Sequence, residues 1–167
     1  MSGLPGLDVS CRDLLGGNSR LYAHKARRKK IALVGVELTN SGPGPQRVHL
    51  GRAMLTAGDR EHTVERPGVI LRKLGEFTWD FFLFAILDMH PVFIITDLGL
   101  FLFGPIYNRR LRRQLRELTD ADLVLPAGGV HTVVLGFRGV PAGTPCRVEI
   151  PFTTPENAER IACGGYG

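Results

Sequence analysis

Alternating apolar residues predict β-strands before a long apolar central segment. In "KKIALVGVELTNSGPG", apolar residues recur at every second position from Ala32 to Leu38, which is the period of a β-strand. The Gly- and Pro-rich stretch 40–45 is typical of a turn. A second strand is expected over 46–59.

The strand pattern returns after the central segment. We expect a short strand and a turn over 121–129, followed by strands over 130–140 and 144–154. Short strands at this spacing, with Gly and Pro turns between them, are typical of a β-sandwich. The fold class is therefore mainly β.

Both ends of the chain carry weaker patterns. We expect an N-terminal segment over 1–20, with a short edge strand at Leu7–Ser10. The single β-sandwich domain is expected over 21–154, interrupted by a helical insert over 77–118. The C-terminal tail, 155–167, is expected to be frayed or to form a short helix over 155–163.

Two stretches of the strand pattern resemble a known family. "VGVELTNSG", followed much later by "LVLPAGGVHTVVLGFRGVPAG", is similar to bacterial immunoglobulin-like domains of cell-envelope proteins. The matching residues are Thr39, Asn40, Pro126, Gly128, Gly136, Phe137 and Pro141. The resemblance covers about residues 30–152. It implies a sandwich and an envelope setting, and it implies no activity.

The insert is the most unusual part of the sequence. "FFLFAILDMHPVFIITDLGLFLFGPIY" occupies 81–107, and seven of the nine phenylalanines lie within 77–103. A single transmembrane helix is disfavoured, because Asp88 and Asp97 each cost about 2.5–3.5 kcal/mol near a span centre. Strands of one domain also lie on both sides of the insert, so both of its ends are expected on the same side of a membrane.

A hydrophobic helical hairpin fits the insert better than one span. Its predicted arms are 78–89 and 92–103, with Pro91 in the turn between them. Each arm would reach about 18 Å, which is shorter than the hydrocarbon core of a bilayer, about 30 Å thick. Some of the immunoglobulin-like proteins that the chain resembles also carry a hydrophobic helical insert, although theirs is Gly-rich and this one is rich in Phe, Leu and Ile.

A basic amphipathic helix is predicted over 108–118. Leu111, Leu115 and Leu118 recur at helical spacing, and arginines cover the other faces. The residues expected to dock into a membrane or partner are Trp79, Phe81, Phe82, Phe84, Phe93, Phe101, Phe103 and Tyr107. Those expected to bind an anionic surface are Arg109, Arg110, Arg112, Arg113 and Arg116.

Charge and the N-terminus bear on the partner. The net charge is +5, which favours anionic partners, and the blocks 24–30 and 109–116 carry much of it. A solvated charged face is the alternative reading of the first block.

The N-terminus lacks the features of a signal peptide. "SGLPGLD" is similar to residues that follow the lipid-bearing Cys of bacterial lipoproteins, in which case Met1 replaces that Cys.

Little in the sequence points to catalysis. Asp88, His90 and Asp97 are the ionisable residues inside the apolar region, and they are candidates for a metal or redox site. Polar residues at a hairpin turn are the simpler interpretation, so no metal or cofactor is expected. The three cysteines match no zinc spacing and allow one disulfide with one thiol left over.

These patterns predict a non-catalytic accessory or structural protein, associated with a membrane of a bacterial cell envelope. Its partners are expected to be membrane lipid, a membrane-protein complex, or both. The alternative is a soluble self-assembling or partner-binding protein that uses the hairpin as a protein–protein interface, with a homo-oligomer as one form. Nucleic acid is disfavoured, because the block 24–30 is not interleaved with aromatic residues that could stack on bases.

Overall fold

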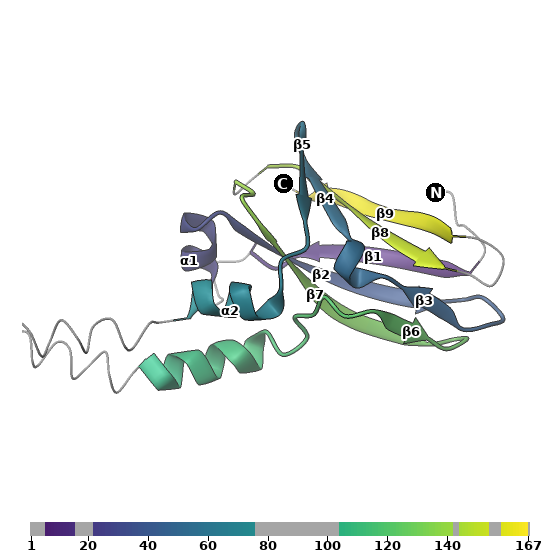
Figure 1. Ribbon diagram of the computed structural model, residues 1–167, viewed down its shortest axis with the longest axis horizontal. Coiled ribbons are helices and arrows are strands. Elements are labelled where there is room, and N and C mark those ends of the chain that lie inside the picture. The colour runs from purple at the N-terminus through teal and green to yellow at the C-terminus, as the bar shows by residue number, and fades with distance from the viewer. Residues whose placement is uncertain (1–5, 16–21, 76–103, 142–143, 154–157, 167) are drawn as a thin grey trace, which may run out of the picture. The chain divides into compact units, whose positions relative to one another are not determined.

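The computed structural model describes residues 6–15, 22–75, 104–141, 144–153 and 158–166, and it is mainly β (Figure 1). Its contacts divide the chain into two compact units. We call residues 1–67 together with 117–167 the β unit, and residues 68–116 the inserted unit.

The β unit contains two antiparallel sheets. The first has three strands in the order β1 (Leu7–Asp13), β2 (Ile31–Asn40) and β7 (Val130–Arg138). The second has six strands, and β8 (Cys146–Thr153) lies at its centre, with β9 (Ala158–Tyr166) along one edge and two short strands along the other. The remaining strands of this sheet are β3 (Gln46–Val48), β4 (Met54–Ala57), β5 (Arg60–Thr63) and β6 (Leu123–Leu125).

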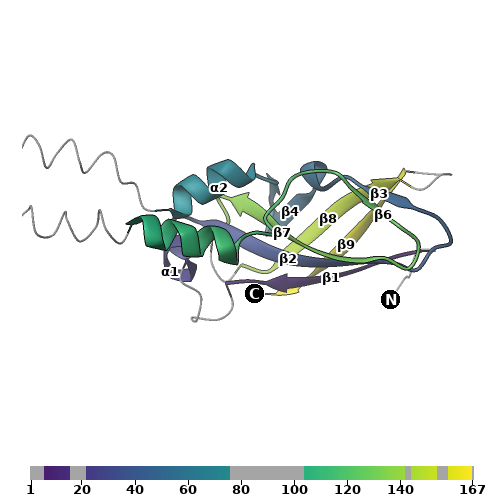
Figure 2. The same ribbon diagram turned by 90° about the horizontal axis from the view of Figure 1, so that it is seen from below.

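Apolar side chains from both sheets form one core. Val36 and Leu135 of the first sheet belong to the same buried cluster as Leu55, Ile150 and Phe152 of the second. Full burial of side chains of this size contributes about 1.5–3 kcal/mol each, so this cluster is the main stabilising feature of the β unit. The strands of the two sheets cross one another in Figure 2. The arrangement is compatible with a β-sandwich.

Strand β2 confirms the alternation read from the sequence. Val34, Val36 and Leu38 face the shared core, and Glu37 is exposed. Leu33 is also fully buried. The helix α1 (Ala23–Arg28) contacts β2. The beginning of β2 is therefore covered on both faces, as a continuous apolar run requires.

One asparagine is completely buried at the end of β2. The side-chain amide of Asn40 donates hydrogen bonds to the carbonyls of Gly44, Leu125 and Pro126 at 2.9–3.0 Å. Its Oδ1 accepts a hydrogen bond from the Gly42 amide at 2.9 Å. Asn40 thus joins the turn after β2 to the turn after β6, which brings together residues of the two sequence stretches that carry the immunoglobulin-like resemblance.

The single strand predicted over 46–59 is wrong in one respect. The structure has two short strands, β3 and β4, separated by the 3₁₀ turn η1 (Leu50–Arg52). Val48 lies opposite Phe152 and Met54 lies opposite Glu149, so five residues of this segment face two residues of β8. The extra residues form the turn, and the Pro151 carbonyl accepts a hydrogen bond from the His49 amide at 2.9 Å.

The two chain ends are more regular than predicted. The expected edge strand at Leu7–Ser10 is present and continues to Asp13. The prediction of a frayed end over 155–167 or a short helix over 155–163 is wrong, because β9 pairs with β8 from Ala158 opposite Thr153 onward. The backbone of β8 offers a free edge for pairing, and this tertiary contact decides the conformation of a segment whose own pattern is weak.

Helix α2 (Pro67–Leu74) lies in the inserted unit except for its first residue, and the same unit contains a second helical stretch at 104–114. Proline is well suited to the first turn of a helix, and Gly75 ends α2, with its amide donating to the Leu71 carbonyl at 2.7 Å. Residues 77–103 of the hairpin predicted over 77–107 lie outside the described residues, so the hairpin stays a prediction.

The basic helix is present, although its end differs from the prediction. Leu111 and Leu115 are buried, and the arginines between them are exposed, which confirms the amphipathic pattern. The helical stretch ends at 114 instead of 118. Leu118 forms a β-bridge with Val134, and this pairing withdraws it from the helix.

Candidate functional site

The two ends of the apolar segment lie side by side in the inserted unit. The Tyr107 hydroxyl donates a hydrogen bond to the Leu74 carbonyl at 3.2 Å, although the two residues are 33 positions apart in the sequence. The residues that flank the apolar segment are therefore held next to each other.

Gly75 makes this close approach feasible. A Cβ atom at this position would lie 2.9 Å from the Asn108 side-chain oxygen and 2.9 Å from the Leu71 carbonyl oxygen. Both distances are shorter than ordinary van der Waals contacts. A residue with a side chain at 75 would therefore push the outgoing and returning segments apart.

The arginines predicted to bind an anionic surface lie in the second helical stretch or directly after it, and all of them are exposed. Arg109, Arg110, Arg112, Arg113 and Arg116 are exposed, whereas Leu111 and Leu115 are each 2% exposed. The described residues of this unit contain no Asp or Glu. The result is a concentrated positive surface next to the end of the apolar segment.

An open depression of about 760 Å³ lies along this arginine surface. Among the described residues, it is lined by Pro105, Asn108, Arg109, Arg112, Arg113 and Arg116. Arg110 is not one of these lining residues. Four of the five predicted arginines therefore line the depression, and the fifth does not.

Of the residues predicted to dock into a membrane or partner, the described part of the chain includes Tyr107. It is half-buried and bonded to Leu74, as described above. The metal or redox candidates Asp88, His90 and Asp97 and the docking residues Trp79, Phe81, Phe82, Phe84, Phe93, Phe101 and Phe103 lie outside the described residues. Within the described ranges, no helix has the length and apolar character needed to cross a membrane, and no group of three His, Cys, Asp or Glu side chains could hold a metal ion.

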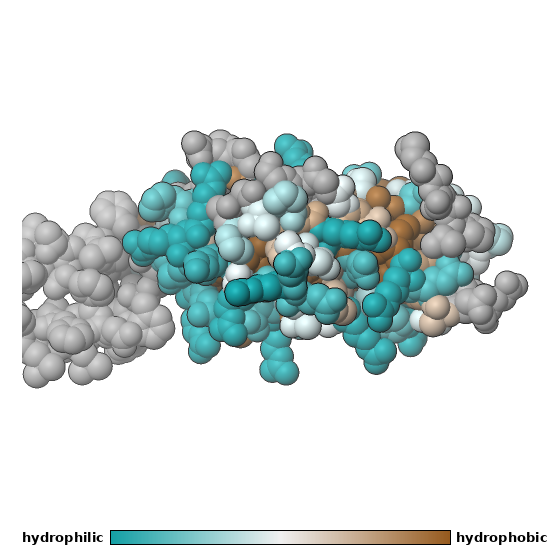
Figure 3. All heavy atoms as spheres, turned by 90° about the horizontal axis from the view of Figure 1, so that it is seen from above, coloured by the Kyte–Doolittle hydropathy of each residue, from teal (hydrophilic) through white to brown (hydrophobic). Residues whose placement is uncertain are grey.

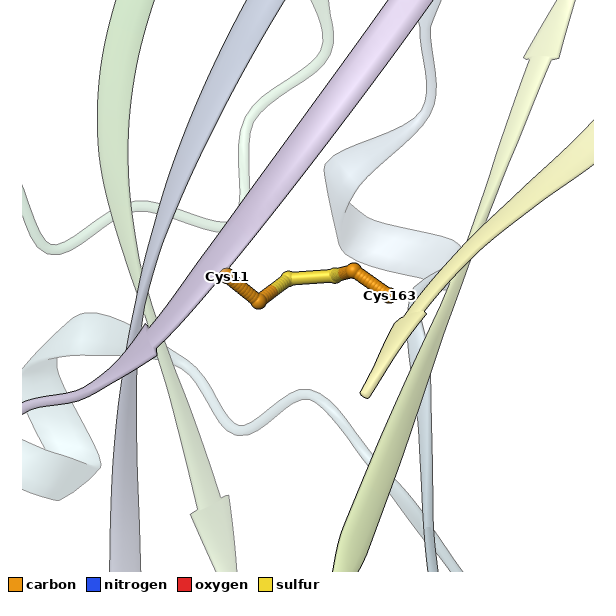
Figure 4. Close-up of a disulfide and its surroundings, with 2 residues drawn as sticks. All are labelled: Cys11 and Cys163. Atoms are coloured by element: carbon orange, nitrogen blue, oxygen red, sulfur yellow. A yellow bond between two sulfur atoms is a disulfide. The ribbon is translucent and has the colours of Figure 1, made fainter. Parts of the chain in front are cut away.

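A disulfide joins the two sheets of the β unit. Cys11 of β1 bonds to Cys163 of β9, with the Cα atoms 5.7 Å apart, and the close-up in Figure 4 shows the bond bridging the two strands. Cys146 of β8 is the third cysteine and carries a free thiol. Burial, and then the charge of the Asp13 carboxylate, raises the pKa of the Cys146 thiol above its ordinary value.

A chain of polar side chains on the β unit was not expected from the sequence. His49 Nδ1 lies 2.9 Å from Asp122 Oδ2, and His49 Nε2 lies 2.9 Å from Thr153 Oγ1. A neutral ring that donates from Nδ1 to the carboxylate accepts the threonine hydrogen at Nε2. Asp122 lies 73 positions after His49 in the sequence, and Thr153 lies 104 positions after it. No local pattern could therefore have indicated these contacts.

The surface seen from above is mainly hydrophilic, with smaller apolar areas between the polar side chains (Figure 3). Large apolar side chains that are at least half exposed among the described residues are Ile106, Val124 and Val130. Ile106 lies next to Tyr107, at the returning end of the apolar segment.

No protein-family model matches this chain, and no curated protein matches it.

Proposed function

We propose that the protein is a non-catalytic, membrane-associated accessory protein of a bacterial cell envelope. In this proposal, the β unit is an immunoglobulin-like sandwich that presents a surface to a partner. The apolar segment 77–107 docks as a helical hairpin into one leaflet of a membrane. The arginines that follow it contact anionic lipid headgroups.

The hydrogen bond between Tyr107 and Leu74 carries the proposal. A segment whose two ends are bonded to each other must return to the side it left, so a docking loop or hairpin fits and a single crossing does not. The arginine surface begins two residues after Tyr107, where headgroups would lie if the apolar segment entered a bilayer. The disulfide supports an exported location, because disulfides persist mainly in oxidising compartments.

Flotation with liposomes tests the proposal. The intact chain is compared with a variant in which 77–103 is replaced by a short Gly/Ser linker, which keeps Leu74 and Tyr107. We expect the intact chain to float with anionic liposomes and the folded variant to remain in the soluble fraction. A chain that stays soluble, forms a detergent-free oligomer and becomes monomeric in the linker variant would instead support the self-association alternative.

The contact between His49, Asp122 and Thr153 favours a second candidate function, acyl transfer with Thr153 as nucleophile. A carboxylate, an imidazole and a hydroxyl in this order are the arrangement by which a general base activates a nucleophile. We rank it second because the Asp122 side chain is 54% exposed and its electrostatic effect is screened by water. Covalent labelling by a fluorophosphonate probe tests it, and the labelling must disappear in Thr153→Val.

A further inference from the structure

Four arginines of the inserted unit line one depression. Arg109, Arg112 and Arg113 lie in the helical stretch 104–114, where 3.6 residues per turn place them within an arc of about 100° that excludes Arg110, and Arg116 follows the end of this stretch. The leucines at 111 and 115 point to a different side and are buried. The four side chains therefore converge on one region, and the open depression of about 760 Å³ lies there. Its volume is within the range of small-molecule sites, about 300–1,000 Å³.

Like charges face each other within this helix. Arg109 and Arg113 are at i,i+4 spacing, which destabilises a helix. Proximity to the helix C-terminus offsets only part of this repulsion. Within the described residues, Arg109, Arg112 and Arg113 form no ion pair, and no carboxylate occurs in this unit. A bound anion would offset the remaining repulsion.

The residue types indicate which anion fits. All four cations are arginines, whose planar guanidinium groups donate two parallel hydrogen bonds to a phosphate. Asn108 adds a neutral amide to the same lining. No aromatic residue occurs among the described lining residues, so a nucleic-acid base would find no stacking partner there.

We propose that Arg109, Arg112, Arg113 and Arg116 form a binding site for a phosphomonoester group, of the kind carried by phosphatidic acid. This inference rests on the proposed membrane function for the lipid as the source of the phosphate. A soluble phosphate ester presents the same chemistry. The site distinguishes a multiply charged phosphate from general negative charge, because it offers several bidentate donors to one group.

Matched charge variants of the full chain test the site. Arg112→Gln with Arg113→Gln removes two lining charges, and Arg72→Gln with Arg110→Gln removes two exposed charges of the same unit outside the lining. Binding is measured with phosphatidylcholine vesicles that contain phosphatidic acid or, at equal surface charge, phosphatidylglycerol. We expect the lining pair to lower partitioning to phosphatidic acid about 30-fold, about fivefold per charge, and the control pair to lower it much less.

A charge-conserving variant separates geometry from charge. Arg112→Lys with Arg113→Lys keeps the net charge and removes the planar donors. We expect it to lose the preference for phosphatidic acid while retaining the binding to phosphatidylglycerol. Equal losses in the lining and control pairs, or equal affinity of the intact chain for the two lipids, would overturn the site and leave only diffuse attraction.

Calorimetry with glycerol 3-phosphate and with inorganic phosphate distinguishes the source of the phosphate. Binding in solution that depends on Arg112 and Arg113 supports the site with a soluble ester as its ligand, even when no vesicle is bound. In that case the membrane proposal fails and the phosphate site stands. Absence of arginine-dependent binding in both vesicles and solution overturns the site.

Discussion

Cys11 and Cys163 form a covalent link between the two sheets, and they are separated by 152 positions in the sequence. In the chain-entropy description, closing a loop of this length restricts the unfolded chain by an amount equivalent to about 5 kcal/mol. Cys11→Ser with Cys163→Ser is therefore expected to lower the free energy of unfolding by about 2–5 kcal/mol. Urea unfolding of the oxidised protein and of the variant measures the difference.

Cys146→Ser is the control for this prediction, because the third cysteine takes no part in the bond. Its unfolding midpoint should stay close to that of the parent chain. If the double variant unfolds at the parent's midpoint, the disulfide contributes nothing to the stability of the β unit.

Replacement of Asn40 by alanine is expected to destabilise the β unit by about 2–4 kcal/mol, because it removes four hydrogen bonds between this buried side chain and the backbone of two turns. The carbonyls of Leu125 and Pro126 lose their shared donor in this variant. Chemical denaturation gives the value. Ser41→Ala, which removes only a 3.4 Å exposed contact to Asp8, should change the stability by less than about 0.5 kcal/mol, and equal effects of the two substitutions would refute the role of Asn40.

Two glycines near the six-stranded sheet are expected to differ sharply when changed to alanine. A Cβ atom on Gly51 would lie 2.6 Å from the backbone oxygen of Asp120, whereas one on Gly44 would meet nothing within 4 Å. Gly51→Ala should cost about 1–3 kcal/mol, because backbone must move. Thermal unfolding of both variants checks this, and a neutral Gly51→Ala would show that η1 adjusts without cost.

The free thiol predicts a pH dependence of labelling. Because burial and then Asp13 raise the pKa of Cys146, its thiolate forms at a higher pH than that of an exposed cysteine. The rate of reaction with iodoacetamide should therefore begin to rise at a correspondingly higher pH. Asp13→Asn removes one of the two causes and should move the rise back toward lower pH.

The same shift has a defined sign for stability. A pKa raised in the folded state favours the protonated thiol there, so this contribution to stability is complete below the unfolded-state pKa and is lost as the pH rises through the folded-state pKa. An alkaline loss of stability that is unchanged in Cys146→Ser would assign the effect to other groups.

Local patterns of the sequence were sufficient for some of these features. Strand β2 and the basic amphipathic helix were predictable because the spacing of apolar and charged residues that defines each of them occurs within a short stretch of sequence. Strand β9 was not, since "AERIACGGY" contains charged residues and glycines, and it becomes a strand by pairing with β8. The bond between Cys11 and Cys163 and the contacts of His49 depend on the tertiary fold, which brings distant positions together. The hairpin expected over 77–107 stays a prediction.

The connection of strands has a consequence for biosynthesis. Strands β1 to β5 precede the apolar segment, whereas β7, a partner of β2, and β8, a partner of β3 and β4, follow it. The N-terminal strands thus leave the ribosome long before the partners that complete their sheets, and long-range pairing of this kind is slow. A chain interrupted after residue 140 would lack both β8 and the second cysteine of the disulfide, so the β unit can close only when the last strands have been made.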